Sequence, residues 1–226
     1  MNPMKSTRIV RPVLALIVAV GLSACASVDT ASRNAPIAAS LNAPLDAGTA
    51  AAVAPSETYK VTAINVTVPE TLRVSEANRY YPSGDIVWRE DPIGNRYQQV
   101  ADIMRAGLER GVARVGGERP VILDVTVARF HALTEKARYT IGGVHAIQFD
   151  ISLRDAESGS LIMPPRRIKA DFDALGGAAA IAAESRGVTQ KVRITNQLAR
   201  VIQDELTRSD GYQQQATGLI GAINQL

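Results

Sequence analysis

The sequence predicts an α+β fold, a two-layer sandwich in which two amphipathic helices pack on one face of a mainly antiparallel sheet. Two long segments carry apolar side chains at three- and four-residue steps on one side only. Several shorter segments are rich in β-branched residues, and one of them alternates between apolar and polar. In chain order these segments read β(β)-α-β-β-β-α. The apolar faces of the helices and the apolar face of the sheet are buried by packing against each other. Because aromatic residues make up only 4% of the 226 residues, we expect an aliphatic core.

The folded part opens with an extended segment, residues 61–68, which is rich in valine, isoleucine and threonine and stops at Pro69. A second short extended piece at 72–74 leads into an irregular stretch at 78–92. That stretch holds a large share of the few aromatic side chains: Tyr80, Tyr81 and Trp88.

The first helix is predicted to begin at Asn95, an N-cap residue whose capping-box partner is Gln98. It ends at the glycine pair 116–117. Two more glycines, Gly107 and Gly111, share the apolar side, where they could allow a close approach to the sheet. The apolar stripe consists of Val100, Ile103, Met104, Leu108, Val112 and Val115.

Three strands are predicted next. Residues 121–133 are largely apolar, as in a central strand, whereas residues 139–154 alternate in polarity. A turn at 155–159 reverses the chain, and we expect the returning strand to break at Pro164–Pro165 before it resumes.

The last part of the chain carries one more helix. Residues 176–184 are small and predict a loop or a weak helical turn, and the helix itself spans about 189–208. Its apolar face comprises Val192, Leu198, Val201, Ile202 and Leu206. The Gln- and Gly-rich tail at 210–226 predicts no element, so the folded domain is predicted to span 58–209.

The N-terminus has the layout of an export signal over residues 1–24: basic residues first, then an apolar run of roughly half the ~20 residues that a bilayer span needs. Leu22, Ser23, Ala24 and Cys25 follow and resemble the lipobox of bacterial lipoproteins. The resemblance implies that the signal peptidase recognises the first three residues and that the thiol of Cys25 takes a diacylglyceryl group. The alternative is an ordinary secretory signal that leaves a stray thiol. Cys25 is the only cysteine, so no disulfide can form within the chain.

Residues 25–57 follow the lipobox and are mostly Ala, Ser, Asn, Pro and Thr, which predicts a flexible tether. Ala26, rather than Asp, follows Cys25. By the rule of the lipoprotein family this favours the outer membrane, and it implies a domain anchored on its periplasmic face. Three acyl chains of the palmitate kind, at ~0.8 kcal/mol per buried methylene, would hold the protein there essentially permanently.

The charge balance argues against a nucleic-acid partner. The chain carries a formal charge of +3, with 25 basic and 22 acidic residues. Three of the basic residues, Lys5, Arg8 and Arg11, lie in the signal segment, which has no acidic residue. The mature chain is therefore close to neutral, and bulk charge gives a polyanion no support.

No catalytic, cofactor or metal site can be assembled from motifs. His131 and His145 lie on neighbouring predicted strands, and His131 could pair with Asp124 or Glu135 as an acid–base unit, but a metal would need a third ligand. His145 shares the parity of Ile147 and is expected to point inward at the edge of the core. The serines and glycine pairs match no nucleophile elbow, phosphate loop or dinucleotide motif. We therefore expect a protein that is not an enzyme and needs no cofactor.

Two acidic residues lie close together on the returning strand. Asp171 and Asp173 alternate with apolar residues, which places both on a solvent face rather than in a glycosidase-type site.

Two groups of residues are candidates for contacting a partner or ligand. The first combines aromatic and arginine side chains: Tyr80, Tyr81, Trp88 and Arg89. The second is basic and suits an anionic partner: Arg129, His131, Lys136, Arg138, Lys191 and Arg193. The alternatives are a loop in which Trp88 fills the edge of the core, and a solvated edge of the sheet.

Residues 85–89, 130–139 and 187–193 resemble an uncharacterised family of bacterial lipoproteins, whose label brings no activity. The lipobox, tether and element order are more loosely similar to the auxiliary lipoproteins of ABC-type envelope transport systems and to LptE-like assembly lipoproteins. The leading hypothesis is a non-catalytic binding or scaffold component of an envelope transport or assembly system, with an envelope protein as partner. The alternatives are a lipid- or glycan-binding module and, third, a hydrolase.

Overall fold

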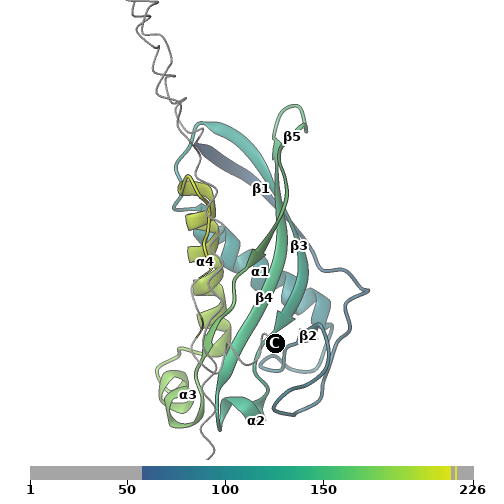
Figure 1. Cartoon of the computed structure of the whole chain (residues 1–226), viewed down its shortest axis with the longest axis vertical. Helices are drawn as coiled ribbons and strands as arrows, with labels where there is room; N and C mark the ends of the chain where they lie inside the picture. Colours follow the sequence, from purple (N-terminus) through teal and green to yellow (C-terminus); the bar gives the residue numbers. More distant parts are fainter. Residues whose placement is uncertain (1–57, 215–216, 218–226) are drawn as a thin grey trace, which may run out of the picture. The chain divides into compact units, whose positions relative to one another are not determined.

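A computed structural model describes residues 58–214 and 217 (Figure 1). The expected signal peptide, the lipobox with Cys25, the tether and most of the tail lie outside the described residues. Within them, no helix is both long and apolar enough to cross a membrane.

The described part contains a six-stranded mixed sheet that is not closed into a barrel, together with four helices. Four long strands lie in the order β1-β3-β4-β5; β1 runs parallel to β3, and the other two pairs are antiparallel. Short β2 continues the edge beside the end of β3, and β6 pairs with the start of β4. The strands are β1 Tyr59–Thr67, β2 Ile86–Val87, β3 Arg119–His131, β4 Gly143–Asp155, β5 Leu161–Lys169 and β6 Phe172–Ala174.

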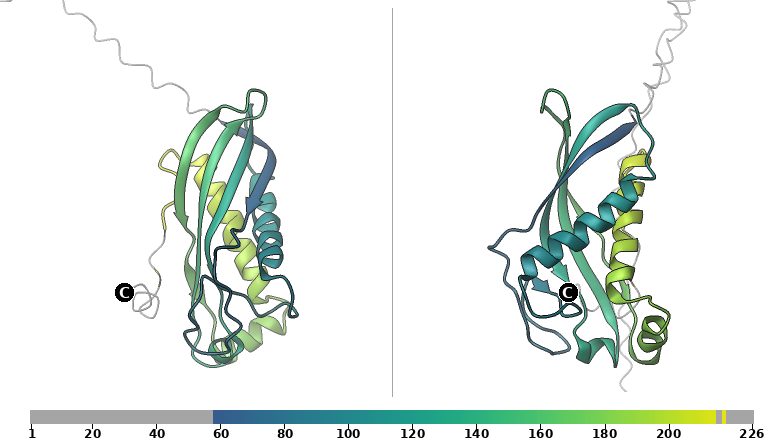
Figure 2. Two further views of the ribbon diagram at one scale, coloured as in Figure 1. Left: turned by 90° about the vertical axis from the view of Figure 1, so that its right-hand side faces the viewer. Right: turned by 180° about the vertical axis from the view of Figure 1, so that it is seen from behind.

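The two long helices, α1 (Arg96–Val112) and α4 (Gln190–Thr207), lie on the same side of the sheet, as Figure 2 shows, so the predicted α+β sandwich is confirmed. Gly107 and Gly111 bring α1 against α4 rather than against the sheet. A Cβ atom at Gly107 would lie 2.7 Å from the Cβ of Leu198, which leaves no space for a larger residue. We call the sheet face under these helices the covered face and the other the open face.

The core is aliphatic, as expected, and lies between the sheet and the two helices. Its strand residues come from alternate positions of β3 and β4, and most of its helix residues come from the predicted stripes. Ile194, which was outside the predicted stripe, is also fully buried, whereas Val192 is half-buried. Fully buried members include Val121, Leu123, Ile147, Ile151, Leu153, Met104, Leu108, Ile194, Leu198 and Ile202. The opposite face carries polar pairs, such as Arg154 with Asp124 at 2.6 Å.

A β-bulge at Ala128 changes which side chains of β3 face the core. The register passes from Val127 opposite Phe149 to Arg129 opposite Gln148, so one residue of β3 has no counterpart. Beyond the bulge Phe130 is buried in the core, whereas Arg129 and His131 lie on the open face. This reversal creates the polar wall of the candidate site.

The connections differ from the prediction in several places. The strand expected from residue 139 begins at Gly143, because Thr134 caps a short helix, α2 (Glu135–Arg138). The small-residue segment forms α3 (Gly177–Glu184). Strand β5 continues through Pro164–Pro165. Proline has no N–H group to donate, but β5 lies at the edge of the sheet, where not every residue needs to donate to a neighbouring strand.

Candidate functional site

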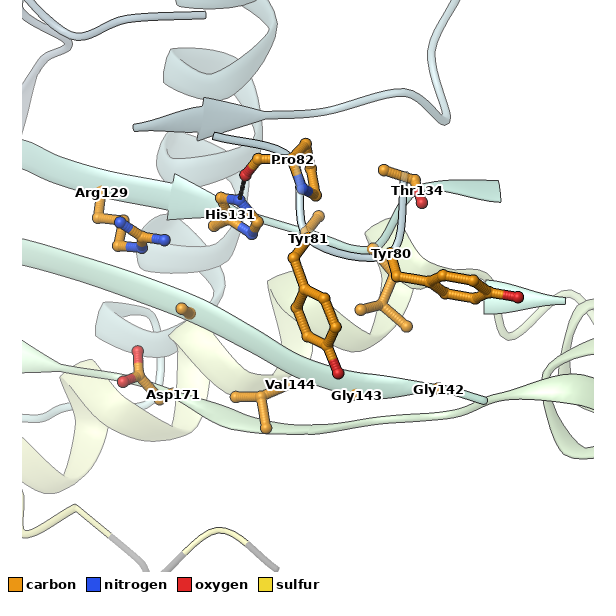
Figure 3. A pocket seen from close by; sticks show the side chains of 13 residues that line it. Tyr80, Tyr81, Pro82, Arg129, His131, Thr134, Gly142, Gly143, Val144 and Asp171 are labelled. Carbon is orange, nitrogen blue, oxygen red and sulfur yellow. Dashed lines mark hydrogen bonds between the residues drawn. The ribbon is translucent and has the colours of Figure 1, made fainter. Parts of the chain in front are cut away.

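A pocket of about 160 Å³ opens on the open face, at the end where β3 finishes and β4 begins (Figure 3). It brings together members of both candidate groups: Tyr80 and Tyr81 from the irregular loop, and Arg129 and His131 from β3. The wall opposite the loop includes Val144 and Ala146 of β4 and the backbone of Gly142 and Gly143. These residues are far apart in sequence, and the fold makes them one site.

Hydrogen bonds fasten the loop to the segment that follows β3, at the start of α2. The Oγ1 of Thr134 donates to the carbonyl oxygen of Arg79 at 2.7 Å, and the backbone N–H of Lys136 donates to Oδ1 of Asn78 at 2.9 Å. The ammonium of Lys136 lies 4.7 Å from the centre of the Tyr80 ring, a cation–π distance. These contacts therefore hold the loop segment that carries Tyr80 and Tyr81 at the pocket.

His131 is part of the same fastening. Its Nε2 lies 3.0 Å from the carbonyl oxygen of Pro82, and because a carbonyl only accepts, Nε2 carries the proton. Burial lowers the pKa of His131, the bond to Pro82 opposes this change, and the charge of Arg129 lowers the pKa further. A neutral ring with a protonated Nε2 has an unprotonated Nδ1, which is a hydrogen-bond acceptor.

Asp171 lines the pocket and was not recognised as a site residue. The prediction of a solvent face was wrong for this residue, whose exposure is only 4%. Its Oδ1 accepts the backbone N–H of Ile147 at 2.8 Å, just where β5 has ended, and burial raises its pKa. The alternation of polar and apolar residues could not reveal that Asp171 is buried. Between β5 and β6 its carboxylate takes the place of a main-chain carbonyl as the acceptor for β4.

Trp88 and Arg89 lie outside the pocket. Trp88 is fully buried, packs edge-on against Phe130 with ring centroids 5.9 Å apart, and donates from Nε1 to Asp91 at 2.8 Å. The structure therefore agrees with the alternative prediction, in which Trp88 fills the edge of the core. Arg89 pairs with Glu135 at 2.6 Å, so its guanidinium is engaged within the protein.

The basic group is likewise divided. Arg138 is buried and pairs with Glu90 at 3.0 Å and with Glu184 at 3.2 Å. Lys191 pairs with Asp91, and Arg193 donates to the carbonyl oxygen of Asp173 at 2.8 Å. Arg129 and His131 line the pocket, and Lys136 stays exposed beside Tyr80. The group is therefore not one continuous basic edge.

The two histidines occupy opposite faces of the sheet. His145 is buried on the covered face, as its parity predicted, and packs against the ring of Phe172 at 4.8 Å. Burial, aided by the charges of Arg193 and Arg138, lowers its pKa to about 3. His131 cannot form the proposed acid–base pairs, because Asp124 bonds to Arg154 and Glu135 to Arg89. Among the described residues, no three His, Cys, Asp or Glu side chains could jointly hold a metal ion.

Residues 59–222 match the model of a family of unknown function, DUF6778, and the chain belongs to that family. No curated protein matches the chain in sequence.

Two solved structures are similar to parts of the chain. A proposed lipoprotein from Caulobacter crescentus CB15 is 24% identical, covering 47% of this chain and 79% of its own, with a TM-score of 0.31. Protein XCC0632 from Xanthomonas campestris, of the family DUF330, is 10% identical, covering 66% of this chain and 84% of its own, with a TM-score of 0.39. Likenesses at this level carry no argument about activity.

Proposed function

We propose that this protein is a lipoprotein, anchored through Cys25 on the periplasmic face of the outer membrane, that binds another envelope component without catalysing a reaction. The observation that carries the binding role is the pocket on the open face, which joins exposed tyrosines to arginine and histidine side chains. Aromatic and arginine side chains are enriched at binding hot spots. A place in an envelope transport or assembly system is the finer part of the proposal and rests on the lipobox, tether and element order.

The size of the pocket selects among the binding hypotheses. Sites for drug-sized ligands are about 300–1,000 Å³. This pocket measures about 160 Å³ and has Arg129, His131 and Asp171 in its walls. It therefore suits one compact polar group of a larger component, such as a glycan, better than it suits a fatty acyl chain.

The arrangement of the titratable groups favours binding over hydrolysis. A general base needs an acceptor atom within reach of the substrate and a partner that orients it. His131 has an orienting partner in the carbonyl of Pro82, but the carboxylates expected to pair with it, Asp124 and Glu135, are engaged by arginines instead. We therefore propose that His131 is a contact residue rather than a catalytic one.

The anchoring half of the proposal is tested by mass spectrometry and membrane fractionation of the native protein beside a Cys25→Ser variant. The expected result is a triacylated Cys25 in the outer membrane and a non-lipidated variant outside that fraction. An unmodified wild-type thiol would overturn the anchor.

The binding half is tested by crosslinking in cells, followed by purification of the anchored protein. The wild type and a Thr62→Ala control, altered on β1 away from the pocket, are expected to recover the same adduct. A Tyr81→Ala, Arg129→Gln double variant is expected to lose it. Equal recovery by all three proteins would contradict a binding role for the pocket.

A further inference from the structure

Arg129 differs from the other arginines of the open face. Arg154 forms two hydrogen bonds with Asp124, at 2.6 and 2.8 Å, and Arg167 likewise engages Asp150. Among residues 58–214, the guanidinium of Arg129 forms neither a hydrogen bond nor an ion pair, although it is half-buried in the pocket wall. In Figure 3 it lies beside His131 on β3, with Asp171 on the other side of β4.

A half-buried arginine without a partner indicates a ligand that brings negative charge. The charge of Arg129 acts on both Asp171 and His131, but Asp171 is itself a poor counter-ion here. Its carboxyl is buried, its pKa is raised, and one oxygen is already bonded to the N–H of Ile147. A carboxylate or phosphate could instead accept two parallel hydrogen bonds from the free guanidinium.

The rest of the pocket supplies acceptors rather than more cations. Nδ1 of neutral His131 can accept a hydrogen bond, and so can the Asp171 carboxylate. Acceptors beside a cationic donor suit a ligand that carries hydroxyl groups as well as an anionic group. A phosphate or carboxylate ion alone lacks the several hydroxyl groups that could donate to both acceptors.

The tyrosines add a flat apolar surface. Tyr81 is 67% exposed and its ring extends across the pocket toward Gly143 and Val144 (Figure 3). An exposed aromatic ring offers its face to the C–H side of another ring. Together with the small volume, this limits the ligand to one ring-sized group.

We propose that this pocket binds an acidic sugar residue, in which a carboxylate or phosphate pairs with Arg129, hydroxyl groups donate to His131 and Asp171, and the ring lies against Tyr81. The inference rests on the proposed binding role of the pocket and names its ligand class. An envelope glycan or a free sugar acid could present this chemistry.

The test uses the full mature protein in detergent and calorimetric or NMR titration with defined probes. The acidic probes are glucuronate, galacturonate and glucose 1-phosphate; the neutral probes are glucose and galactose; inorganic phosphate tests the anion alone. At least one acidic sugar is expected to bind about tenfold more tightly than its neutral counterpart, which lacks the charged pair with Arg129. It is expected to bind about tenfold more tightly than phosphate, which lacks the ring and its hydroxyl groups.

Two variants separate the contributions of Arg129 and Tyr81 to binding. Arg129→Gln should abolish the preference for the acidic sugar over the neutral one, whereas Tyr81→Ala should weaken both. Arg154→Gln, on the same face but outside the pocket, should bind as the wild type does, and circular dichroism should show all three folded. Repeating the titration with isolated envelope glycans distinguishes a polymer-bound residue from a free sugar acid.

Three results would overturn the inference: no binding of any acidic sugar, equal binding of phosphate and acidic sugars, or an unchanged preference in Arg129→Gln. The broader binding role would survive each of them if crosslinking in cells still required Tyr81 and Arg129. It would fail only if those variants also left the crosslink unchanged.

Discussion

The two faces of the sheet place the same types of residue in opposite circumstances. On the covered face, His145 is buried against Phe172, and Trp88 packs against Phe130. On the open face, His131 is fastened to a loop carbonyl and the tyrosine ring at position 81 is exposed. The covered face uses these side chains to hold the fold, whereas under the proposed function the open face presents them to a ligand.

The charged residues differ in the same way. Beneath α3, Arg138 is surrounded by the carboxylates of Glu90 and Glu184, whereas Arg129 in the open-face pocket has no ion-pair partner within the described part of the chain. Satisfied charges in a packed region serve structure, because leaving them unpaired is costly. Under the proposed function, the charge left unpaired at the pocket serves recognition. The comparison therefore assigns roles to residues that the sequence had grouped together.

The largest expected effect comes from removing an aromatic side chain from each face in turn. Trp88→Ala should lower the free energy of unfolding by about 3–5 kcal/mol, because it empties a fully buried volume and leaves the Asp91 carboxylate without its indole donor. Tyr81→Ala should change it by about 0.5 kcal/mol or less, because that ring is mostly exposed. Urea unfolding measures both, and similar losses would contradict the assignment of the two aromatic residues.

Removing the charge of Arg138 is the next strongest perturbation. Arg138→Met should cost about 3 kcal/mol, because two partly buried carboxylates, Glu90 and Glu184, lose their shared cation. The matched change Lys136→Met, two residues earlier and exposed, should cost little. A cost below about 1 kcal/mol for Arg138→Met would show that the network contributes no net stability.

The pH dependence of stability should distinguish the histidines. The pKa of His145 falls from 6.5 to about 3 on folding, so between these values the unfolded chain binds a proton that the native chain does not. Stability should therefore fall as the pH drops below 6.5, by up to about 1.4 kcal/mol per pH unit from this residue.

The matched variants are His145→Gln and His131→Gln, each unfolded in urea at pH 7, 6 and 5. The slope should flatten more in His145→Gln than in His131→Gln, because His131 is less completely buried. An unchanged slope in His145→Gln would mean that the ring is accessible to protons in the native state.

The smallest effect concerns the fastening of the loop. Thr134→Val should cost about 1 kcal/mol, since it removes the hydroxyl that donates to Arg79 and caps α2. Thr134→Ser retains the hydroxyl and should restore most of this stability. Hydrogen exchange should report faster opening of residues 78–82 in the valine variant only; uniform protection would show that other contacts hold the loop.

Much of the fold could be predicted because its long elements have clear periodicity. The stripes of α1 and α4 and the alternation of β4 directly record which side is buried. The short elements β2 and α2 contain too few residues to show a periodic pattern, so the sequence did not predict them. The bulge at Ala128 was missed although the pattern records it: the polar positions are Asp124 and Thr126 before the bulge and Arg129 and His131 after it, so their parity changes.

The site was predicted in two halves that the sequence could not join. Tyr80 and Tyr81 stood in one candidate group, and Arg129 and His131 stood in another. Contacts such as that of His131 with Pro82 join them, and contacts between residues 49 positions apart have no local signature. Residue type also could not separate Trp88 from Tyr81, or Arg138 from Arg129, because the difference lies in burial and pairing.

The central claim, that the open face near Tyr81 is the binding surface, is tested most directly by site-specific photocrosslinking in cells. A photoreactive amino acid replaces Tyr81 in one strain and exposed Glu109, on the helix side, in another. The account predicts a discrete adduct from position 81, lost when Arg129→Gln is added, and none from position 109. An adduct from position 109 alone, or one from position 81 that is indifferent to Arg129, would contradict it.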